Sequence, residues 1–285
     1  MMKSIVTLFA LFFLSVSALA EVSNAEKKAL LEFNTAANGA QWINKWDITK
    51  PVSTWYGVSV VNDKVVGINL SDNNLTGFLT PHLCDLKNLQ VLVLFKNKLE
   101  GELPIAIGQL KNLQVLDVSF NQISGRIPSD IAGAVALREL ILFMNNFSGP
   151  IPDSIGALTH LEVVSLYNNR LTGQLPATIY SLKGLRILEL NSNELEGSLT
   201  PEIANLTALQ TLSLFDNRLN GSVPFEIEAM PNLTAMNISY NKFNGFVSKK
   251  MYTKDQMNMT MINEQGLAVN LAIKADSTSA IAEEE

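Results

Sequence analysis

The sequence repeats itself every 24 residues. Asparagine recurs at this spacing eight times and a glycine follows each one four residues later, at Asn73, Asn97, Asn121, Asn145, Asn169, Asn193, Asn217 and Asn241, and at Gly77, Gly101, Gly125, Gly149, Gly173, Gly197, Gly221 and Gly245. Self-similarity at a fixed period of this length is the signature of stacked repeats. The sequence therefore predicts a solenoid in which each coil covers the apolar edge of its neighbour.

The apolar residues of one repeat indicate how a coil is built. Leu92 and Leu94 alternate with period two, which predicts a short parallel strand whose leucines face inward while Val91, Val93 and Phe95 face outward. Asn97 follows where the chain must turn inward, and its amide offers a donor and an acceptor to backbone groups that no strand ladder can satisfy.

This pattern resembles the plant-type subclass of the leucine-rich repeat family, whose unit is LxxLxxLxLxxNxLxGxIPxx. Residues 113–131, LQVLDVSFNQISGRIPSDI, match that unit almost letter for letter, and the resemblance covers 65–251. It implies an α/β solenoid: a right-handed superhelix of eight 24-residue coils with a parallel β-sheet on the concave face. The family includes receptors, enzyme inhibitors and adhesion proteins, so the resemblance alone does not fix the function.

The first twenty residues look like an export signal. Lys3 gives a positive start, residues 5–14 are almost unbroken apolar, and Ala18 and Ala20 are the small residues that a signal peptidase requires. An uncleaved anchor is the alternative, but a spanning helix needs about 20 apolar residues. We expect residues 1–20 to be a signal peptide and the product to be secreted, extracellular or periplasmic if bacterial, with no membrane span after cleavage.

Residues 21–64 are expected to form a helical N-terminal cap. Ser23 and Glu26 make a capping box before an amphipathic helix, and all three tryptophans fall in this span, where they can seal the first coil. Trp55-Tyr56-Gly57-Val58 resembles the WxGV of plant-type caps, but the cysteines of that family are missing. A disulfide-free cap is similar to those of secreted bacterial leucine-rich repeat proteins.

Residues 252–285 are expected to close the other end. Leu267, Val269, Leu271 and Ile273 alternate with less apolar residues, which predicts a C-terminal cap strand. The small, polar and acidic residues from Ala275 onward predict a flexible tail.

Composition excludes several kinds of chemistry. The 285 residues carry 21 Lys and Arg against 27 Asp and Glu, a net charge of −6, which lacks the basic footprint of a nucleic-acid-binding protein. One Cys and two His supply neither an internal disulfide nor a structural zinc site. Cys84 falls in a column of small residues, so we expect a buried thiol, and His82 and His160 are expected to be solvated. No nucleophile constellation is found, so no enzyme activity and no cofactor are expected.

The outward columns of the predicted sheet point to a binding face. The first reads Ser71, Phe95, Ser119, Phe143, Tyr167, Asn191, Phe215 and Ser239, and the next reads Asp72, Lys96, Phe120, Met144, Asn168, Ser192, Asp216 and Tyr240. Six of these sixteen residues are aromatic, against 7% of the chain. The rings could merely stiffen the sheet as cross-strand pairs. Contiguous aromatics on a concave solenoid surface are, however, typical of an interaction site.

The candidate ligand-binding residues follow from these columns. Contact area would come from Phe95, Phe120, Phe143, Met144 and Tyr167, and polar orientation from Asn168, Asn191, Glu139, Glu162 and Arg186. The acidic residues of this face could hold a cation, but their places shift between columns and basic Arg138 and Arg186 lie among them. They are therefore interpreted as mixed solvated charge, at Asp117, Glu139, Glu162 and Glu189.

The function expected from these observations is a monomeric, secreted, non-enzymatic protein that recognises a peptide, protein or polysaccharide on its concave face. Adhesion, recognition, enzyme inhibition or a receptor-like role would all fit. The alternative is an ice-binding or purely structural solenoid, since some plant-type repeat proteins are antifreezes. Ice binding requires a regular array of small hydroxyl residues, whereas the column from Asn74 through Lys98 and Arg170 to Lys242 is charged and irregular.

Overall fold

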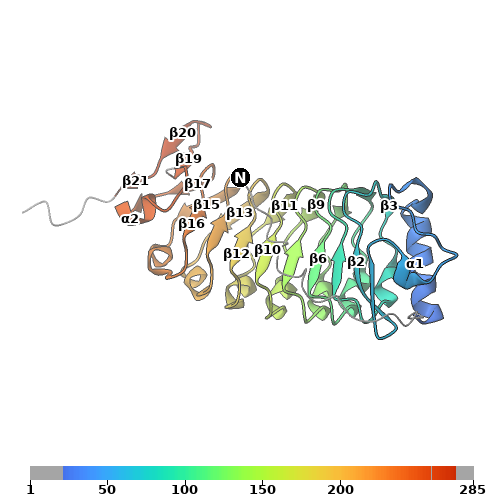
Figure 1. Ribbon diagram of the computed structural model, residues 1–285. Coiled ribbons are helices and arrows are strands. Elements are labelled where there is room, and N and C mark those ends of the chain that lie inside the picture. Colours follow the sequence, from blue (N-terminus) through green and yellow to red (C-terminus); the bar gives the residue numbers. More distant parts are fainter. Residues whose placement is uncertain (1–21, 258, 274–285) are drawn as a thin grey trace, which may run out of the picture.

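The computed structural model describes residues 22–257 and 259–273, which form one curved solenoid with a helix at its N-terminal end (Figure 1). The proposed signal peptide, the acidic tail and residue 258 lie outside the described residues. The solenoid expected from the repeat is confirmed.

The largest sheet runs along the whole solenoid, in the order β1-β2-β4-β6-β8-β10-β12-β14-β16. All neighbours are parallel except β1 and β2, and paired residues are 24 apart, as Val91 pairs with Val115 and Val115 with Glu139. Its strands are β1 (Val58–Val61), β2 (Lys64–Asn69), β4 (Val91–Val93), β6 (Val115–Asp117), β8 (Glu139–Ile141), β10 (Val163–Ser165), β12 (Ile187–Glu189), β14 (Thr211–Ser213) and β16 (Ala235–Asn237).

A second set of short parallel strands lies beyond the asparagine of each coil. It comprises β3 (Thr76–Phe78) paired with β5 (Lys98–Glu100), and a sheet of β7 (Ser124–Gly125), β9 (Asn146–Gly149), β11 (Arg170–Gly173), β13 (Glu194–Ser198), β15 (Arg218–Ser222) and β17 (Lys242–Asn244). The repeat glycine, which lies within this segment or directly after it, has a positive φ in every coil. At Gly77, with φ +80°, a Cβ would also lie 2.2 Å from the Ala36 carbonyl of the cap.

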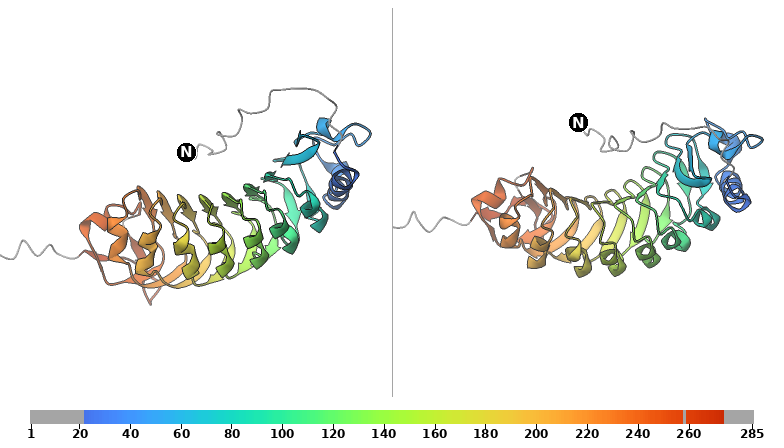
Figure 2. Two further views of the ribbon diagram at one scale, coloured as in Figure 1. Left: turned by 90° about the horizontal axis from the view of Figure 1, so that it is seen from below. Right: turned by 60° about the horizontal axis from the view of Figure 1, so that its bottom comes forward.

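One short 3₁₀ helix in each of the first seven coils completes the repeat on the outer side of the curve (Figure 2). Packing there is close: a Cβ on Gly108 would lie 1.8 Å from the Asp130 carbonyl of the next coil, which explains the small residues of this column. The helices are η4 (Pro81–Asp85), η5 (Ile105–Gln109), η6 (Ser129–Gly133), η7 (Asp153–Ala157), η8 (Ala177–Ser181), η9 (Pro201–Asn205) and η10 (Phe225–Ala229).

The repeat asparagines, which we call the asparagine ladder, join each coil to the previous one by hydrogen bonds. Asn97 Oδ1 accepts hydrogen bonds from the backbone N–H of Asn73 and Leu75, at 3.0 and 2.9 Å, and its Nδ2 donates to the carbonyls of Leu70 and Leu94, both at 2.9 Å. At Asn145 the Oδ1 accepts from the Ile123 N–H and the Nδ2 donates to the carbonyls of Val118 and Leu142. The proposed role of the asparagine amide is therefore confirmed, and it links neighbouring coils as well as closing its own turn.

The N-terminal end is closed by α1 (Asn24–Ala36), two short 3₁₀ helices, η2 (Gly39–Gln41) and η3 (Val52–Thr54), and strand β1. Ser23 caps the helix by accepting from the Glu26 N–H, while the Glu26 side chain reaches across to the Val65 N–H. The three tryptophans are buried, with exposed fractions of 6% or less, and Trp46 stacks on Trp55 at 4.8 Å.

His82 is exposed, as expected. Its Nδ1 also lies 3.3 Å from a carboxylate oxygen of Glu32 in α1 and 3.2 Å from one of Asp85, so the side chain links the cap helix to the first coil. His160 is exposed, as expected.

The C-terminal end differs from the single strand expected there. The described residues after 245 form β18 (Phe246–Val247), α2 (Lys249–Tyr252), β19 (Thr260–Ile262), β20 (Ala268–Asn270) and β21 (Ala272–Ile273). The β19–β20 hairpin rises above the coils at this end of the solenoid (Figure 1). Leu271 is buried, but Leu267, Val269 and Ile273 are exposed. Of the four alternating residues, Val269 lies in β20 and Ile273 in β21, while Leu271 separates the two strands.

Candidate functional site

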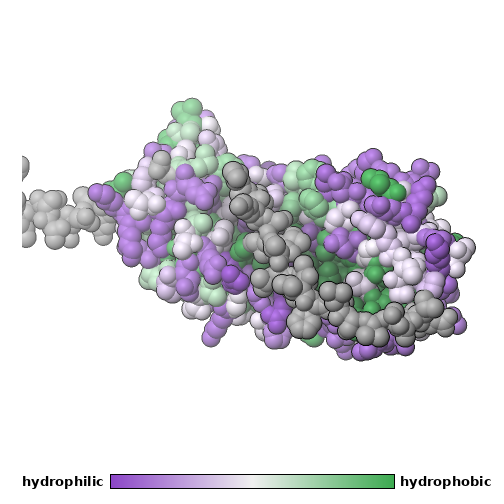
Figure 3. Space-filling model, viewed as in Figure 1, coloured by the Kyte–Doolittle hydropathy of each residue, from purple (hydrophilic) through white to green (hydrophobic). Residues whose placement is uncertain are grey.

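Four rings from successive coils meet on the face of the largest sheet. Phe143 and Tyr167 stack at 4.4 Å between centroids, Phe95 lies 6.4 Å from Phe143, and Phe120 lies 6.2 Å from Phe95. We call Phe95, Phe120, Phe143 and Tyr167 the aromatic cluster. Figure 3 shows hydrophobic residues on this face around β2 and β6.

The rings of Phe95 and Phe143 cover the small residue Ser119 between them. Phe95 and Phe143 follow strands two coils apart, which would separate them by about 9.6 Å if they stood upright. Their centroids are only 6.4 Å apart, and Ser119 of the intervening coil has no exposed surface. The two rings therefore lean toward each other over Ser119, and the cluster is one continuous surface.

The second outward column has an unusual backbone. Every residue of this column has a positive φ, including Phe120 at +56°, Met144 at +52° and Asn168 at +54°. This left-handed conformation suits asparagine and disfavours Phe and Met by about 1 kcal/mol each. The coil geometry imposes the conformation on whichever residue falls there.

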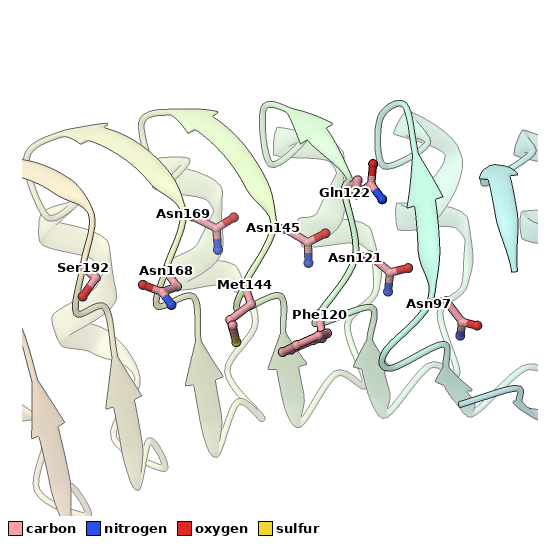
Figure 4. Close-up of a pocket in the computed structure, with 9 residues that line it drawn as sticks. All are labelled: Asn97, Phe120, Asn121, Gln122, Met144, Asn145, Asn168, Asn169 and Ser192. Atoms are coloured by element: carbon pink, nitrogen blue, oxygen red, sulfur yellow. The ribbon is translucent and has the colours of Figure 1, made fainter. Parts of the chain in front are cut away.

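Phe120, Met144 and Asn168 line a shallow groove of about 440 Å³ with Ser192 and the ladder asparagines. Figure 4 shows Phe120 and Met144 as neighbours in the groove, with Asn121, Asn145 and Asn169 in a row beside them. The side-chain amides of Asn121, Asn145 and Asn169 are hydrogen-bonded to the backbone. The other side chains that line the groove are those of Phe120, Gln122, Met144, Asn168 and Ser192.

The charged candidates fall into two groups. Arg138 and Arg186 both reach Glu162, at 2.5 Å and 3.9 Å, in a row just before the strands begin. Glu139 starts β8 and is half-buried, and burial, together with the Glu162 and Asp117 charges, raises the pKa of its carboxyl. Glu162 and Arg186 are thus paired with each other and with Arg138, whereas Glu139 lies on the sheet face.

Asp117 lies beneath the cluster. It is 9% exposed, its Oδ1 accepts from the Ser119 hydroxyl at 2.5 Å and from the Ser119 N–H at 2.9 Å, and burial raises the pKa of its carboxyl. Glu189 lies beyond Tyr167 and accepts from the Ser165 hydroxyl at 2.8 Å. Burial and then the charges of Glu189 and Asp117 raise the pKa of Tyr167 to about 12.

The structure thus brings Phe95, Phe120, Phe143 and Tyr167 together and places Met144 and Asn168 in the adjoining groove. Asn191 follows Tyr167 by one coil and is half-buried. Sequence reasoning set aside Asp117 and Glu189, although their column positions already placed them on the same face. A second pair, Phe215 and Tyr240, meets at 5.2 Å farther along the sheet.

Features needed for other chemistry are not found in the described part of the chain. Residues 22–257 and 259–273 hold no group of three or more His, Cys, Asp or Glu placed to bind a metal ion. Cys84 is buried, and burial raises the pKa of its thiol to about 12. Among the helices of these residues, none has the length and apolar character needed to cross a membrane.

Comparison with solved structures finds plant receptor ectodomains. The ectodomain of the Arabidopsis thaliana receptor kinase GASSHO1/SCHENGEN3, in complex with CASPARIAN STRIP INTEGRITY FACTOR 2, is 36% identical, with a TM-score of 0.63 over 72% of this chain and 24% of that one. The plant peptide hormone receptor RGFR1, in complex with RGF2, is 31% identical, with a TM-score of 0.64 over 73% of this chain and 32% of that one. The chain spans a third or less of the length of these two structures.

A plant ice-binding protein shares the fold, with 23% identity and a TM-score of 0.58 over 90% of this chain and 100% of that one. No curated protein matches the chain. The family model described as "Leucine-rich repeat region" matches residues 65–245. The repeat, the asparagine ladder and these comparisons together show that the chain belongs to the leucine-rich repeat family, in its plant-type form.

Proposed function

We propose that this is an extracellular, non-enzymatic binding protein that recognises a peptide or protein segment on the concave face, at the aromatic cluster. The observation that carries the proposal is the joining of Phe95, Phe120, Phe143 and Tyr167 into one partly exposed surface. Aromatic side chains dominate the energetics of interfaces, where a few residues supply most of the binding energy.

The backbone of the second column supports this proposal. Asparagine would suit the positive φ at Phe120 and Met144 better than the residues present, so folding alone does not favour large apolar side chains there. Phe120 is nevertheless 42% exposed. A side chain that is unfavourable for the backbone and incompletely buried is better explained by contact with a ligand.

The similar structures add support of the same kind. The GASSHO1/SCHENGEN3 ectodomain was solved in complex with CASPARIAN STRIP INTEGRITY FACTOR 2. The plant peptide hormone receptor RGFR1 was solved in complex with RGF2. A ligand of protein or peptide nature is therefore our first choice, and a polysaccharide is the second.

The surface supports ice binding less well. In the column that would have to be regular, Lys98 donates to Asn74 at 2.9 Å and Arg218 pairs with Glu194 at 2.8 Å. Long charged side chains of this kind break up a flat hydroxyl array. Thermal hysteresis in the purified protein would favour ice binding over our proposal.

The test is a binding array of peptides and cell-wall polysaccharides, probed with the wild type and with a Phe143→Ala/Tyr167→Ala variant. Each lost aromatic contact should weaken binding by about 1 to 2 kcal/mol. Phe225→Ala is the matched control, because Phe225 is 54% exposed on η10, away from the sheet face. Equal binding by the double variant and the wild type would place the site elsewhere. Early melting of the double variant would show that the rings are structural.

A further inference from the structure

The floor beside the aromatic cluster combines apolar and acidic side chains. Val115, Ile141 and Val163 are half-buried on the sheet face. The strand register sets Glu139 between Val115 and Val163, and Ile141 beside Asp117. Glu189 pairs with Ser165, one strand beyond Tyr167's own. Three carboxylates therefore border an apolar floor that ends at the rings of Phe143 and Tyr167.

These three carboxylates lack basic partners within the described part of the chain. The ion pairs of this region are Arg138 and Arg186 with Glu162, and Lys96 with Asp72. None of the pairs found among residues 22–257 and 259–273 includes Asp117, Glu139 or Glu189. The hydrogen-bond donors to Asp117 and Glu189 are neutral Ser side chains and a backbone N–H.

The negative charges of these carboxylates raise the pKa values of neighbouring groups. Burial is the main reason that the pKa of Asp117 and of Glu139 is raised, and the charges of Glu162 and Asp117 raise the pKa of Glu139 further. The Tyr167 hydroxyl lies close enough to Glu189 and Asp117 for both charges to oppose its ionisation. A positive charge placed here would relieve all of these interactions.

We infer that the concave face takes a basic side chain of its ligand, best an arginine, with the stem on Val115, Ile141 and Val163 and the guanidinium between the carboxylates and the rings. This rests on the function proposed above and specifies the ligand as a peptide with a basic residue. A guanidinium suits the surface because it is planar, pairs with carboxylates and stacks on aromatic faces. The long stem can lie on apolar surface while the head remains polar.

The experiment compares two bead libraries of eight-residue peptides. Seven positions are randomised identically, and the fixed position is arginine in one library and citrulline, its neutral isostere, in the other. Fluorescent wild-type protein should label about tenfold more beads of the arginine library. The excess should shrink as sodium chloride is raised, because screening weakens charge pairs at a surface.

Two variants locate the effect. An Asp117→Asn/Glu139→Gln variant should label the two libraries equally, whereas Glu196→Gln, which removes a charge from β13 outside the large sheet, should keep the arginine preference. If the double variant melts early, Glu139→Gln alone replaces it, since Glu139 is half-buried and makes no ion pair with any described residue.

The outcomes separate this inference from the proposed function. Equal labelling of both libraries by the wild type would overturn the inference and leave peptide binding intact. No labelled beads in either library would overturn both. An arginine preference that survives in the carboxylate variants would overturn the assignment to Asp117 and Glu139.

Discussion

The rings of Phe143 and Tyr167 lie face to face, 4.4 Å apart with 6° between their planes. The two residues are 24 positions apart in the sequence, and the parallel register of β8 and β10 makes them neighbours. The stacking follows from the repeat length, because any aromatic pair in this column of adjacent coils is placed at the spacing of adjacent strands.

Replacing Phe120 by asparagine should weaken ligand binding while leaving stability almost unchanged. The loss of contact with Phe95 is offset by relief of the positive φ, two effects of about 1 kcal/mol each. Chemical denaturation should therefore show a change within about 1 kcal/mol. Phe147→Ala is the contrast, since Phe147 has no exposed surface and its loss should cost about 3 to 5 kcal/mol. A similarly large loss for Phe120→Asn would mean that this ring belongs to the core.

Asn145→Leu should destabilise the protein by at least about 3 kcal/mol, because each buried backbone group left without a partner costs about 1 to 3 kcal/mol. The substitution removes the acceptor of the Ile123 N–H and the donor to the carbonyls of Val118 and Leu142. Urea denaturation of the wild type and the variant measures the difference. A loss below 1 kcal/mol would contradict the role of the asparagine ladder.

Asp117→Asn should change the pH dependence of stability. Burial raises the folded-state pKa of Asp117 above the ordinary value of 3.8, so its protonated form favours folding. That contribution is complete below pH 3.8 and is lost as the pH rises through the raised pKa. The variant lacks it, so its unfolding free energy relative to wild type should increase from about pH 4 upward and then level off. Denaturation curves between pH 4 and 8 measure this trend, and a flat or falling difference would count against a buried carboxylate.

Cys84 should be inert in the folded protein. It is 1% exposed, and burial raises the pKa of its thiol to about 12, so almost no thiolate forms near neutral pH. Iodoacetamide at pH 8 should label the thiol only after denaturant is added, as measured by mass spectrometry. Rapid labelling under native conditions would show that the coil opens there.

Much of the fold could be predicted from the sequence because the constraint is periodic. Asn97 and its equivalents fix the turn, and the leucine alternation fixes which side chains face outward. Phe143 and Tyr167 are one 24-residue repeat apart in an outward column, so their proximity could be predicted from the repeat length. Strand β1 was not predicted. Its signal was the Asn62-Asp63 pair, both with positive φ, which closes the hairpin with β2.

The details of the site needed the structure. The leaning of Phe95 and Phe143 over Ser119 depends on side-chain rotation, which the periodicity does not encode. Asp117, interpreted from the sequence as solvated charge, is only 9% exposed, between Val93 and Ile141 on the neighbouring strands. The left-handed backbone at Phe120 and Met144 was hidden because neither residue type favours it.

The most direct test of the binding face is hydroxyl-radical footprinting with a ligand obtained from the array. Oxidation of Phe120, Met144 and Tyr167, read residue by residue by mass spectrometry, should fall when ligand is added, because these side chains would be covered. Phe225 and Phe246, which are 54% and 61% exposed and lie off the large sheet, should react equally with and without ligand. Protection of Phe225 or Phe246 with no protection of Tyr167 would contradict a ligand site at the aromatic cluster.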